Sequence, residues 1–368
     1  MSKQPFIPVA EPSLGDQELA YVVDCVKSGW VSSLGEYVRR FESGFAQYCG
    51  VDYGIATCNG TVALHLLAAT LKLGPGDEVI MPTLTFVATA NAIAYTGATP
   101  VFVDSESDTW NIDPEKVSAA ITPNTKAILA VHLYGHPANM APLRKIADEH
   151  GLLLLEDAAE AHGACYQGQR TGSLADAAIF SFYGNKIITT GEGGIIVTNN
   201  KAWADRAFFL ENQGRHSDNP YWHPEMAFNY RMTNVQAAIG LAQLERIESL
   251  IEARRRNAVY YQERLSELPD VILHPEMPWA KNVYWMYSIL IEDGFGLSRD
   301  EVCRQLREQG IDTRPFFYPI HTLPMYKIDR VYPVAEYLGD RGINLPSSAT
   351  LTVEQIDRVC DTLISLHP

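Results

Sequence analysis

Between residues 53 and 200, short apolar runs rich in β-branched residues alternate with stretches whose apolar residues recur at helical spacing. Such alternation is typical of a parallel sheet with crossover helices. The order predicts a doubly wound α/β domain, whose ligands bind beyond the carboxyl ends of the strands. The predicted strands are Tyr53–Thr57, Glu78–Met81, Thr99–Asp104, Ala127–Val131, Leu152–Glu156, Ala178–Phe182 and Ile195–Thr198, and helices are expected at Thr61–Leu71, Phe86–Tyr95 and Ala141–Glu149.

The pattern changes after Met232, where a long, charge-rich helical run is predicted over Ala237–Leu268. Short strands near Tyr284–Ile291 and a helix at Arg299–Gln309 follow it. We therefore predict a large α/β domain over residues 1–235 and a smaller α+β domain over residues 236–368.

The early segment Leu19–Tyr48 has a helical pattern, interrupted by the turn-like stretch Ser28–Gly35. Loops placed on a rigid scaffold often carry binding residues. We expect this turn, with Trp30 and Ser33, to face the substrate.

The composition narrows the possible partners. The 368 residues carry a formal net charge of −15, which leaves no basic face for a nucleic acid or an anionic membrane. An anionic ligand must then be held locally, by helix N-termini and a few arginines.

The six cysteines are scattered, without a C-x-x-C pair and without the His/Cys spacing of a zinc site. They indicate buried thiols in a reducing compartment, and no metal site is expected. The N-terminal residues lack the apolar core of a signal peptide, and no apolar run approaches the length of a membrane span. We therefore expect a cytoplasmic protein that does not enter a membrane.

Thr57–Thr61 forms the turn between a predicted strand and a predicted helix. Gly60 lets the backbone approach a ligand closely, and the helix that begins near Thr61 directs free N–H groups outward. These features suit a phosphate. Taken alone, the same residues also describe an ordinary glycine turn with Thr61 as a helix cap.

Four consecutive leucines lead directly into Glu156 and Asp157. A carboxylate at a buried strand end is costly unless it meets a cation. A protonated pyridine nitrogen is such a cation, and it is what makes the ring of pyridoxal phosphate (PLP) an electron sink. Asp157 is therefore the candidate partner of that nitrogen, whereas Glu156 reads as a helix-capping acid. Glu160 either reaches the cofactor's phenolic oxygen or is simply the first exposed helix residue.

Lys186 follows an aromatic strand that ends at Ser181 and precedes the glycine-rich stretch at residues 191–194. A lone lysine is usually a solvated surface charge. These surroundings would instead desolvate the amine, lower its pKa and favour a Schiff base. No role is assigned to His132, His136 or His162, because lone histidines near strand ends are more often structural.

The segments NGTVAL, EDAAEAHG, SFYGNK and TTGEGG, in this order and spacing, resemble the DegT/DnrJ/EryC family of sugar aminotransferases. The similarity runs from IPVAEPSL near the N-terminus to GINLPS near the C-terminus. The resemblance implies the aspartate aminotransferase fold (PLP fold type I) and PLP as the cofactor.

The family pattern also implies roles for single residues. Lys186 would carry the cofactor and Asp157 would pair with its pyridine nitrogen, while Phe86 would cover the ring. Gly60, Thr61 and Ser181 would hold the phosphate. Many members have Gln or His where this chain has Glu160. The group that polarises the phenolic oxygen therefore stays open, whereas the reaction class does not, since those members also transfer amino groups.

Asn229–Asn234 precedes the long helix. In the family, this segment comes from the neighbouring subunit, with Asn229 nearest the phosphate, which implies a homodimer with shared active sites. A capped helix start at Thr233 or Asn234 describes it equally well. Further candidate substrate contacts are Tyr183, Arg231, Arg314 and His321, although surface salt bridging or packing accounts equally well for the last two.

The resemblance implies transfer of an amino group, with L-glutamate as the donor, to a nucleotide-linked 4-keto sugar. The strings VHLYGHP, FNYRMTN, TRPFFYPIHTLPMY and RGINLPS are most similar to members that act on GDP-4-keto-6-deoxy-D-mannose. A UDP- or dTDP-4-keto-6-deoxyhexose is the alternative, since selectivity rests on base and hydroxyl contacts that a sequence does not display. A PLP-dependent sugar dehydratase is disfavoured by Lys186, because members with that activity have His there. A non-catalytic binding protein is disfavoured by the intact set of Lys, Asp and Ser.

Overall fold

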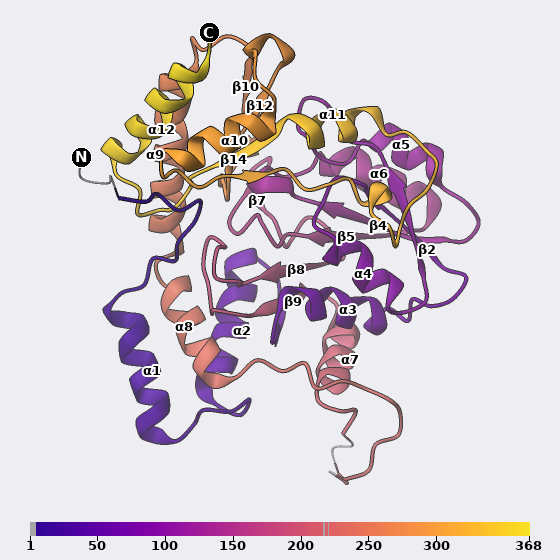
Figure 1. The fold of residues 1–368 in the computed structure, drawn as a ribbon. Coiled ribbons are helices and arrows are strands. Elements are labelled where there is room, and N and C mark those ends of the chain that lie inside the picture. The colour runs from indigo at the N-terminus through magenta and orange to yellow at the C-terminus, as the bar shows by residue number, and fades with distance from the viewer. Residues whose placement is uncertain (1–4, 216–217, 220) are drawn as a thin grey trace.

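The structure is a computed structural model that describes residues 5–215, 218–219 and 221–368. Its centre is a seven-stranded sheet with the order β1-β9-β8-β5-β4-β2-β3 (Figure 1). The strands are β1 (Tyr53–Thr57), β2 (Glu78–Pro82), β3 (Thr99–Val103), β4 (Thr125–Val131), β5 (Leu153–Asp157), β8 (Ala177–Ser181) and β9 (Gly194–Thr198). All neighbours pair in parallel except β9, which runs antiparallel to both β1 and β8. The predicted α/β class and all seven predicted strands are confirmed.

Both faces of the sheet are buried, as expected for a doubly wound domain. Ile80, Ile128 and Leu154 point to one face, where they pack with Val117 and Leu143 of the flanking helices. Those helices are α5 (Pro114–Ala120) and α6 (Met140–His150), and they lie on the opposite side of the sheet from α3 and α4 (Figure 1).

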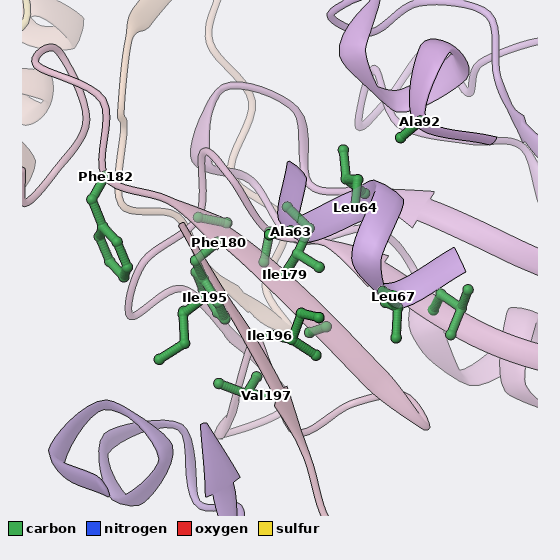
Figure 2. Close-up of a cluster of buried hydrophobic side chains, with 14 of the residues drawn as sticks. Ala63, Leu64, Leu67, Ala92, Ile179, Phe180, Phe182, Ile195, Ile196 and Val197 are labelled. Carbon is green, nitrogen blue, oxygen red and sulfur yellow. The ribbon is translucent and has the colours of Figure 1, made fainter. Parts of the chain in front are cut away.

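The opposite face carries the largest hydrophobic cluster. Figure 2 shows Ala63 and Leu67 of α3 in one buried group with Phe180 of β8 and Ile196 of β9. The helices that contribute to this cluster include α2 (Glu36–Cys49), α3 (Gly60–Thr70), α4 (Ala88–Ala94) and α7 (Lys201–Glu211). Helix α4 starts later than the predicted Phe86–Tyr95, so Phe86 lies in the loop that precedes it.

The predicted helical run over Ala237–Leu268 is wrong in one respect, because the structure divides it. Helix α8 (Asn234–Leu244) and helix α9 (Ile247–Leu265) meet at Arg246, whose backbone leaves the helical region. The bend allows Gln243 and Arg246 to bind the carboxylate of Glu18 in α1 (Asp16–Ser28). No glycine or proline marks this position in the sequence, and the break follows from tertiary contacts.

The C-terminal part contains a second, antiparallel sheet with the order β10-β12-β14-β13. Its strands are β10 (Val271–Leu273), β12 (Tyr287–Ile291), β13 (Arg314–Pro315) and β14 (Gly342–Leu345), and its helices are α10 (Arg299–Glu308), α11 (Pro333–Arg341) and α12 (Val353–Leu366). Tyr261 of α9 and Val359 of α12 share a core with Ile289 and Ile343 of the sheet. The last small sheet joins β11 (Ala280–Lys281), β6 (Cys165–Tyr166) and β7 (Gln169–Arg170).

The N-terminal arm packs on this C-terminal part. The backbone of Ile7 bonds to Gly310 and Asp312, with N···O distances of 2.9 Å for both bonds. Val9 accepts from the N–H of Ser347 at 2.9 Å. Ile7 is fully buried in the C-terminal core. The two ends of the sequence are therefore held together in space.

Candidate active site

The site lies where β1, β8 and β5 end. These three strands are parallel to one another in direction, so the residues that follow them emerge at the same edge of the sheet. A Cβ atom added to Gly60 would lie 2.7 Å from the Cβ of Ser181, which shows how closely the turn after β1 approaches the end of β8. The predicted phosphate residues are thus neighbours, and glycine is required for the approach.

The turn after β1 presents the N-terminus of α3. Asn59 caps the helix by accepting a hydrogen bond from the N–H of Val62 at 3.0 Å. The first N–H groups of a helix, here those of Gly60 and Thr61, have no intrahelical acceptor and attract an anion. The turn therefore has the chemistry of a phosphate cradle.

Asp157 ends β5 with only 5% of its surface exposed. Its carboxylate accepts hydrogen bonds from the hydroxyl of Thr89 at 2.8 Å and the N–H of Ala159 at 3.2 Å. Burial raises the pKa of this carboxyl. A cation facing the carboxylate would offset the cost of its charge, as the nitrogen of a pyridinium ring would.

Lys186 projects from the loop between β8 and β9. Its Nζ lies 3.8 Å from Oε1 of Glu160 and 3.6 Å from the centre of the Trp285 ring. The side chain is 11% exposed, and burial lowers the pKa of the amine, although the charges of Glu160 and Asp157 oppose this effect. A desolvated amine with a lowered pKa is a better nucleophile towards an aldehyde at neutral pH.

Glu160 is buried beside this amine. Its Oε2 accepts the backbone N–H of Tyr134 at 2.8 Å, and Tyr134 adopts a left-handed backbone with φ +52°. Burial raises the pKa of the Glu160 carboxyl, which Lys186 partly opposes. The position of Glu160 therefore differs from that of an exposed first residue of a helix.

Exposed aromatic rings surround the same edge of the sheet. Phe86 is 53% exposed and its ring centre lies 5.6 Å from that of Phe317, while Tyr183 is 52% exposed. A large exposed ring next to buried polar groups is suited to covering a flat ligand.

Trp30, Ser33 and Arg231 lie around a cavity of about 930 Å³ between the α1–α2 turn and residues 208–234. Two hydrogen bonds join the guanidinium of Arg231 to Oδ1 of Asn229, the shorter at 2.9 Å. The backbone of this segment runs beside the end of β1, since Cys58 donates to the carbonyl of Tyr230 at 2.7 Å. Within one chain, these residues line a cavity whose wall does not include Lys186.

Arg314 begins β13, and His321 lies in a 3-10 turn between β13 and α11. Arg314 bonds to Asp312 at 2.5 Å and its side chain is 54% exposed. His321 is buried, and its ring nitrogens contact the hydroxyl of Thr83 at 2.8 Å and the carboxylate of Glu336 at 3.2 Å. Arg314 is thus accessible to a ligand, whereas His321 already has a partner for each nitrogen.

Three residues beside the site were not singled out from the sequence: Thr89, Arg254 and Trp285. Thr89 binds Asp157 from α4, and Arg254 binds the backbone around Lys186 from α9. Each comes from an element distant in sequence from its partner. Only a pairing of elements, which a single sequence does not display, would have found them.

Within the described part of the chain, no group of His, Cys, Asp or Glu side chains is arranged to hold a metal ion. No helix there is long and apolar enough to cross a membrane. The donors at the site instead fit PLP: an anion cradle at Gly60, a buried carboxylate for a pyridinium nitrogen and a desolvated amine.

Comparison with known proteins gives matches over almost the whole chain. The sequence profile of the DegT/DnrJ/EryC1/StrS aminotransferase family matches residues 12–364. The chain is 48% identical to the GDP-perosamine synthase of Caulobacter vibrioides, covering 99% of each chain. It is 46% identical to that of Escherichia coli O157:H7, covering 97% of this chain and 98% of the relative. The crystal structure of DesI, determined in the presence of its TDP-sugar product, superposes with a TM-score of 0.92 at 38% identity, covering 98% of this chain and 93% of DesI.

Proposed function

Because the chain belongs to the DegT/DnrJ/EryC1/StrS aminotransferase family, we propose that it is a PLP-dependent GDP-perosamine synthase. It transfers an amino group to C4 of GDP-4-keto-6-deoxy-D-mannose, with L-glutamate as the donor. The observation that carries the proposal is the identity of 46–48% to GDP-perosamine synthases over nearly the full chain.

Bound PLP supplies an electron sink that stabilises negative charge next to the reacting carbon. Lys186 would hold the cofactor through Nζ, and the same amine would carry a proton between the carbon atoms that exchange it. Asp157 keeps the ring nitrogen protonated. Its buried position supports this role, because low polarity strengthens the pairing of a carboxylate with a cation.

The phosphate is held by the N-terminus of α3 and by Ser181. Gly60 and Thr61 offer backbone N–H groups there, and the close approach of Gly60 to Ser181 supports a shared ligand. Asn229 of a second subunit completes this cradle. Phe86 covers the ring and Glu160 faces its phenolic oxygen.

The substrate is an anion in a protein of net charge −15, so it needs local cations. Arg231 and Arg314 serve this purpose, and Trp30 supplies a flat surface for the base. Ser33 and Tyr183 contact the sugar. His321 shapes the site through its bonds to Thr83 and Glu336 rather than by direct contact.

The active enzyme is a homodimer with shared sites. Trp30, Ser33 and Arg231 line a cavity whose wall does not include Lys186, which supports a site that is completed by a second copy. On α1, Leu19 and Val26 are 64% and 66% exposed and lie on one helical face with Val23, which favours a subunit contact in this region. The cysteines are all free thiols, which supports a cytoplasmic location.

The alternative is a UDP- or dTDP-linked substrate. The observation in its support is the structural similarity to DesI, which was determined in the presence of its TDP-sugar product. We would incubate the purified protein with PLP, glutamate and the GDP-, UDP- and dTDP-4-keto-6-deoxyhexoses, and compare kcat/KM. The GDP sugar should be preferred, and the product mass should show replacement of the ketone by an amine. A preference for either other nucleotide would refute the GDP assignment and leave the aminotransferase assignment intact.

A further inference from the structure

Trp285 makes two distinct contacts with the lysine loop. The face of its indole ring lies 3.6 Å from Nζ of Lys186, measured to the ring centre. The edge of the same ring donates its Nε1–H to the carbonyl of Asn185 at 2.8 Å. One side chain thus touches both the amine of Lys186 and the backbone just before it.

The ring is held firmly in this position. Trp285 is 5% exposed, and Tyr134 stacks near it with an angle of 23° between the rings. Arg254 donates hydrogen bonds to the carbonyls of Trp285 at 3.1 Å and of Lys186 at 3.5 Å. A single buried cation therefore fixes the backbone of both partners.

Few groups other than the Trp285 ring lie close enough to stabilise a charged Lys186 amine. Among the described residues, only Glu160 places a carboxylate oxygen within 4 Å of Nζ, and its distance of 3.8 Å is longer than a hydrogen bond. An indole face within about 6 Å attracts an ammonium ion electrostatically, most strongly where water is excluded. The ring face and Glu160 together form a site that stabilises Nζ in its charged form.

We propose that Trp285 is a positioning residue, whose indole face receives the Nζ ammonium of Lys186 whenever the lysine is not bonded to the cofactor. The proposal rests on the proposed function, since the aminotransferase cycle releases this lysine in every turnover. In each half-reaction, Nζ takes up one proton and gives one proton back. The ring stabilises the charged amine between these two steps. It also keeps the amine next to the carbon atoms that exchange the proton with it.

The ring stabilises the ammonium form of Lys186, and this contact therefore raises the pKa of the amine. Measuring that pKa tests the contact. The other charged or titratable groups around Nζ remain when the ring is removed: Asp157 at the end of β5, Glu160 and His162 after β5, Tyr134 after β4 and Arg254 of α9. A change in the Lys186 pKa on substitution of Trp285 would therefore isolate the contribution of the ring.

The test measures the pKa of Lys186 in the full-length, PLP-free protein. The protein is labelled with trace acetic anhydride at a series of pH values, and acetylation of Lys186 is quantified by peptide mass spectrometry. Trp285→Leu keeps an apolar side chain and removes the ring face, so the midpoint should fall by about one pH unit. Trp285→Phe keeps a ring face and loses Nε1–H, and its midpoint should stay closer to that of the wild type than to that of Trp285→Leu.

Trp279 packs on His136 and Tyr166. Trp279→Leu is therefore the matched control, and it should leave the midpoint of Lys186 acetylation unchanged. Equal shifts in the Leu and Phe variants would assign the effect to the Nε1–H bond and overturn the proposal. An unchanged midpoint in Trp285→Leu would overturn it as well.

Fluorinated tryptophan provides a second measurement that does not depend on the folding of Trp285→Leu. Fluorine weakens the negative face of the ring with little change of shape, so the midpoint should fall as fluorination increases. The same replacement in Trp285→Phe should have no effect, and an equal fall there would overturn the proposal. Separately, failure of added PLP to form a borohydride-reducible adduct at Lys186 would refute the proposed function, whatever the midpoints are.

Discussion

Asp157→Asn should separate catalysis from folding. The substitution keeps the shape of the side chain and removes its charge. A neutral amide cannot hold a proton on a pyridine nitrogen, so the electron sink is lost. We expect kcat to fall by at least about 10³-fold, which corresponds to ~4 kcal/mol of activation free energy at ~1.4 kcal/mol per tenfold.

The contacts of Asp157 predict a much smaller effect on stability. One oxygen accepts from the N–H of Ala159, and an amide oxygen takes this bond over. The other accepts from the hydroxyl of Thr89, which also lies 3.2 Å from the hydroxyl of Thr85. The Thr89 hydroxyl can rotate to accept from the new NH₂ group and donate to Thr85. The exchange of one hydrogen bond costs ~1 kcal/mol or less.

In the PLP-free protein, removing the charge of Asp157 should raise the stability, which opposes the small loss from the exchanged hydrogen bond. Burial raises the pKa of Asp157 in the folded state. The stability that its proton contributes is complete below the unfolded pKa of about 3.9 and is lost as the pH rises through the folded pKa. At pH 7 the buried charge is therefore a cost, which the amide removes. The PLP-free variant should be at least as stable as the wild type.

The assays are kcat/KM with the GDP keto sugar and glutamate, and urea unfolding of the PLP-free proteins at pH 7. Asp104→Asn is the matched control, because Asp104 is a buried aspartate whose carboxylate accepts N–H groups at the start of α11. We expect this control to lose stability and to keep its activity. A kcat for Asp157→Asn within about tenfold of the wild-type value would refute the role of Asp157.

Four further outcomes are expected. Lys186→Ala should be colourless and should lose both turnover and the borohydride-reducible adduct, and near wild-type turnover would contradict the assignment. Mixed Lys186→Ala and Asn229→Ala subunits should recover activity that neither has alone, whereas a fully active monomer in solution would exclude shared sites. Gly60→Ala should weaken PLP binding measured by fluorescence titration, because its Cβ would displace Ser181, at a cost of about 1–3 kcal/mol. Burial raises the pKa of Glu211 to about 9, so this group should make wild-type stability fall as the pH rises from 5 to 8; Glu211→Gln should show a shallower fall, and equal pH slopes in urea unfolding would count against it.

The strands and the cofactor residues were predictable because their signals are local. Asp157 follows an apolar run and Gly60 lies in a turn, so each marks the end of a strand within a few residues. In the structure β1 and β5 run in the same direction, although β9 lies antiparallel between β1 and β8, so these ends meet at one edge of the sheet.

The remaining features depend on contacts between distant elements. Arg254 lies in a charge-rich helical pattern that suggests solvent exposure, yet it is 4% exposed and binds three backbone carbonyls. The bend at Arg246 and the contact of Trp285 with Lys186 have the same origin. Helical periodicity tells which face of an element is apolar, but it does not tell which partner covers that face.

The N-terminal arm has a consequence for the order in which the chain folds during synthesis. The N–H of Glu11 bonds to the hydroxyl of Ser348, 337 residues further along the chain. At a ribosomal rate of about 5–20 residues per second, the arm waits on the order of tens of seconds before the segment after β14 that contains Ser348 is made. The seven-stranded sheet can assemble in that interval, since its last strand ends at Thr198. The arm therefore docks after the sheet has formed, and a nascent chain that stops before Gly310 would leave Ile7 and Val9 open to proteolysis.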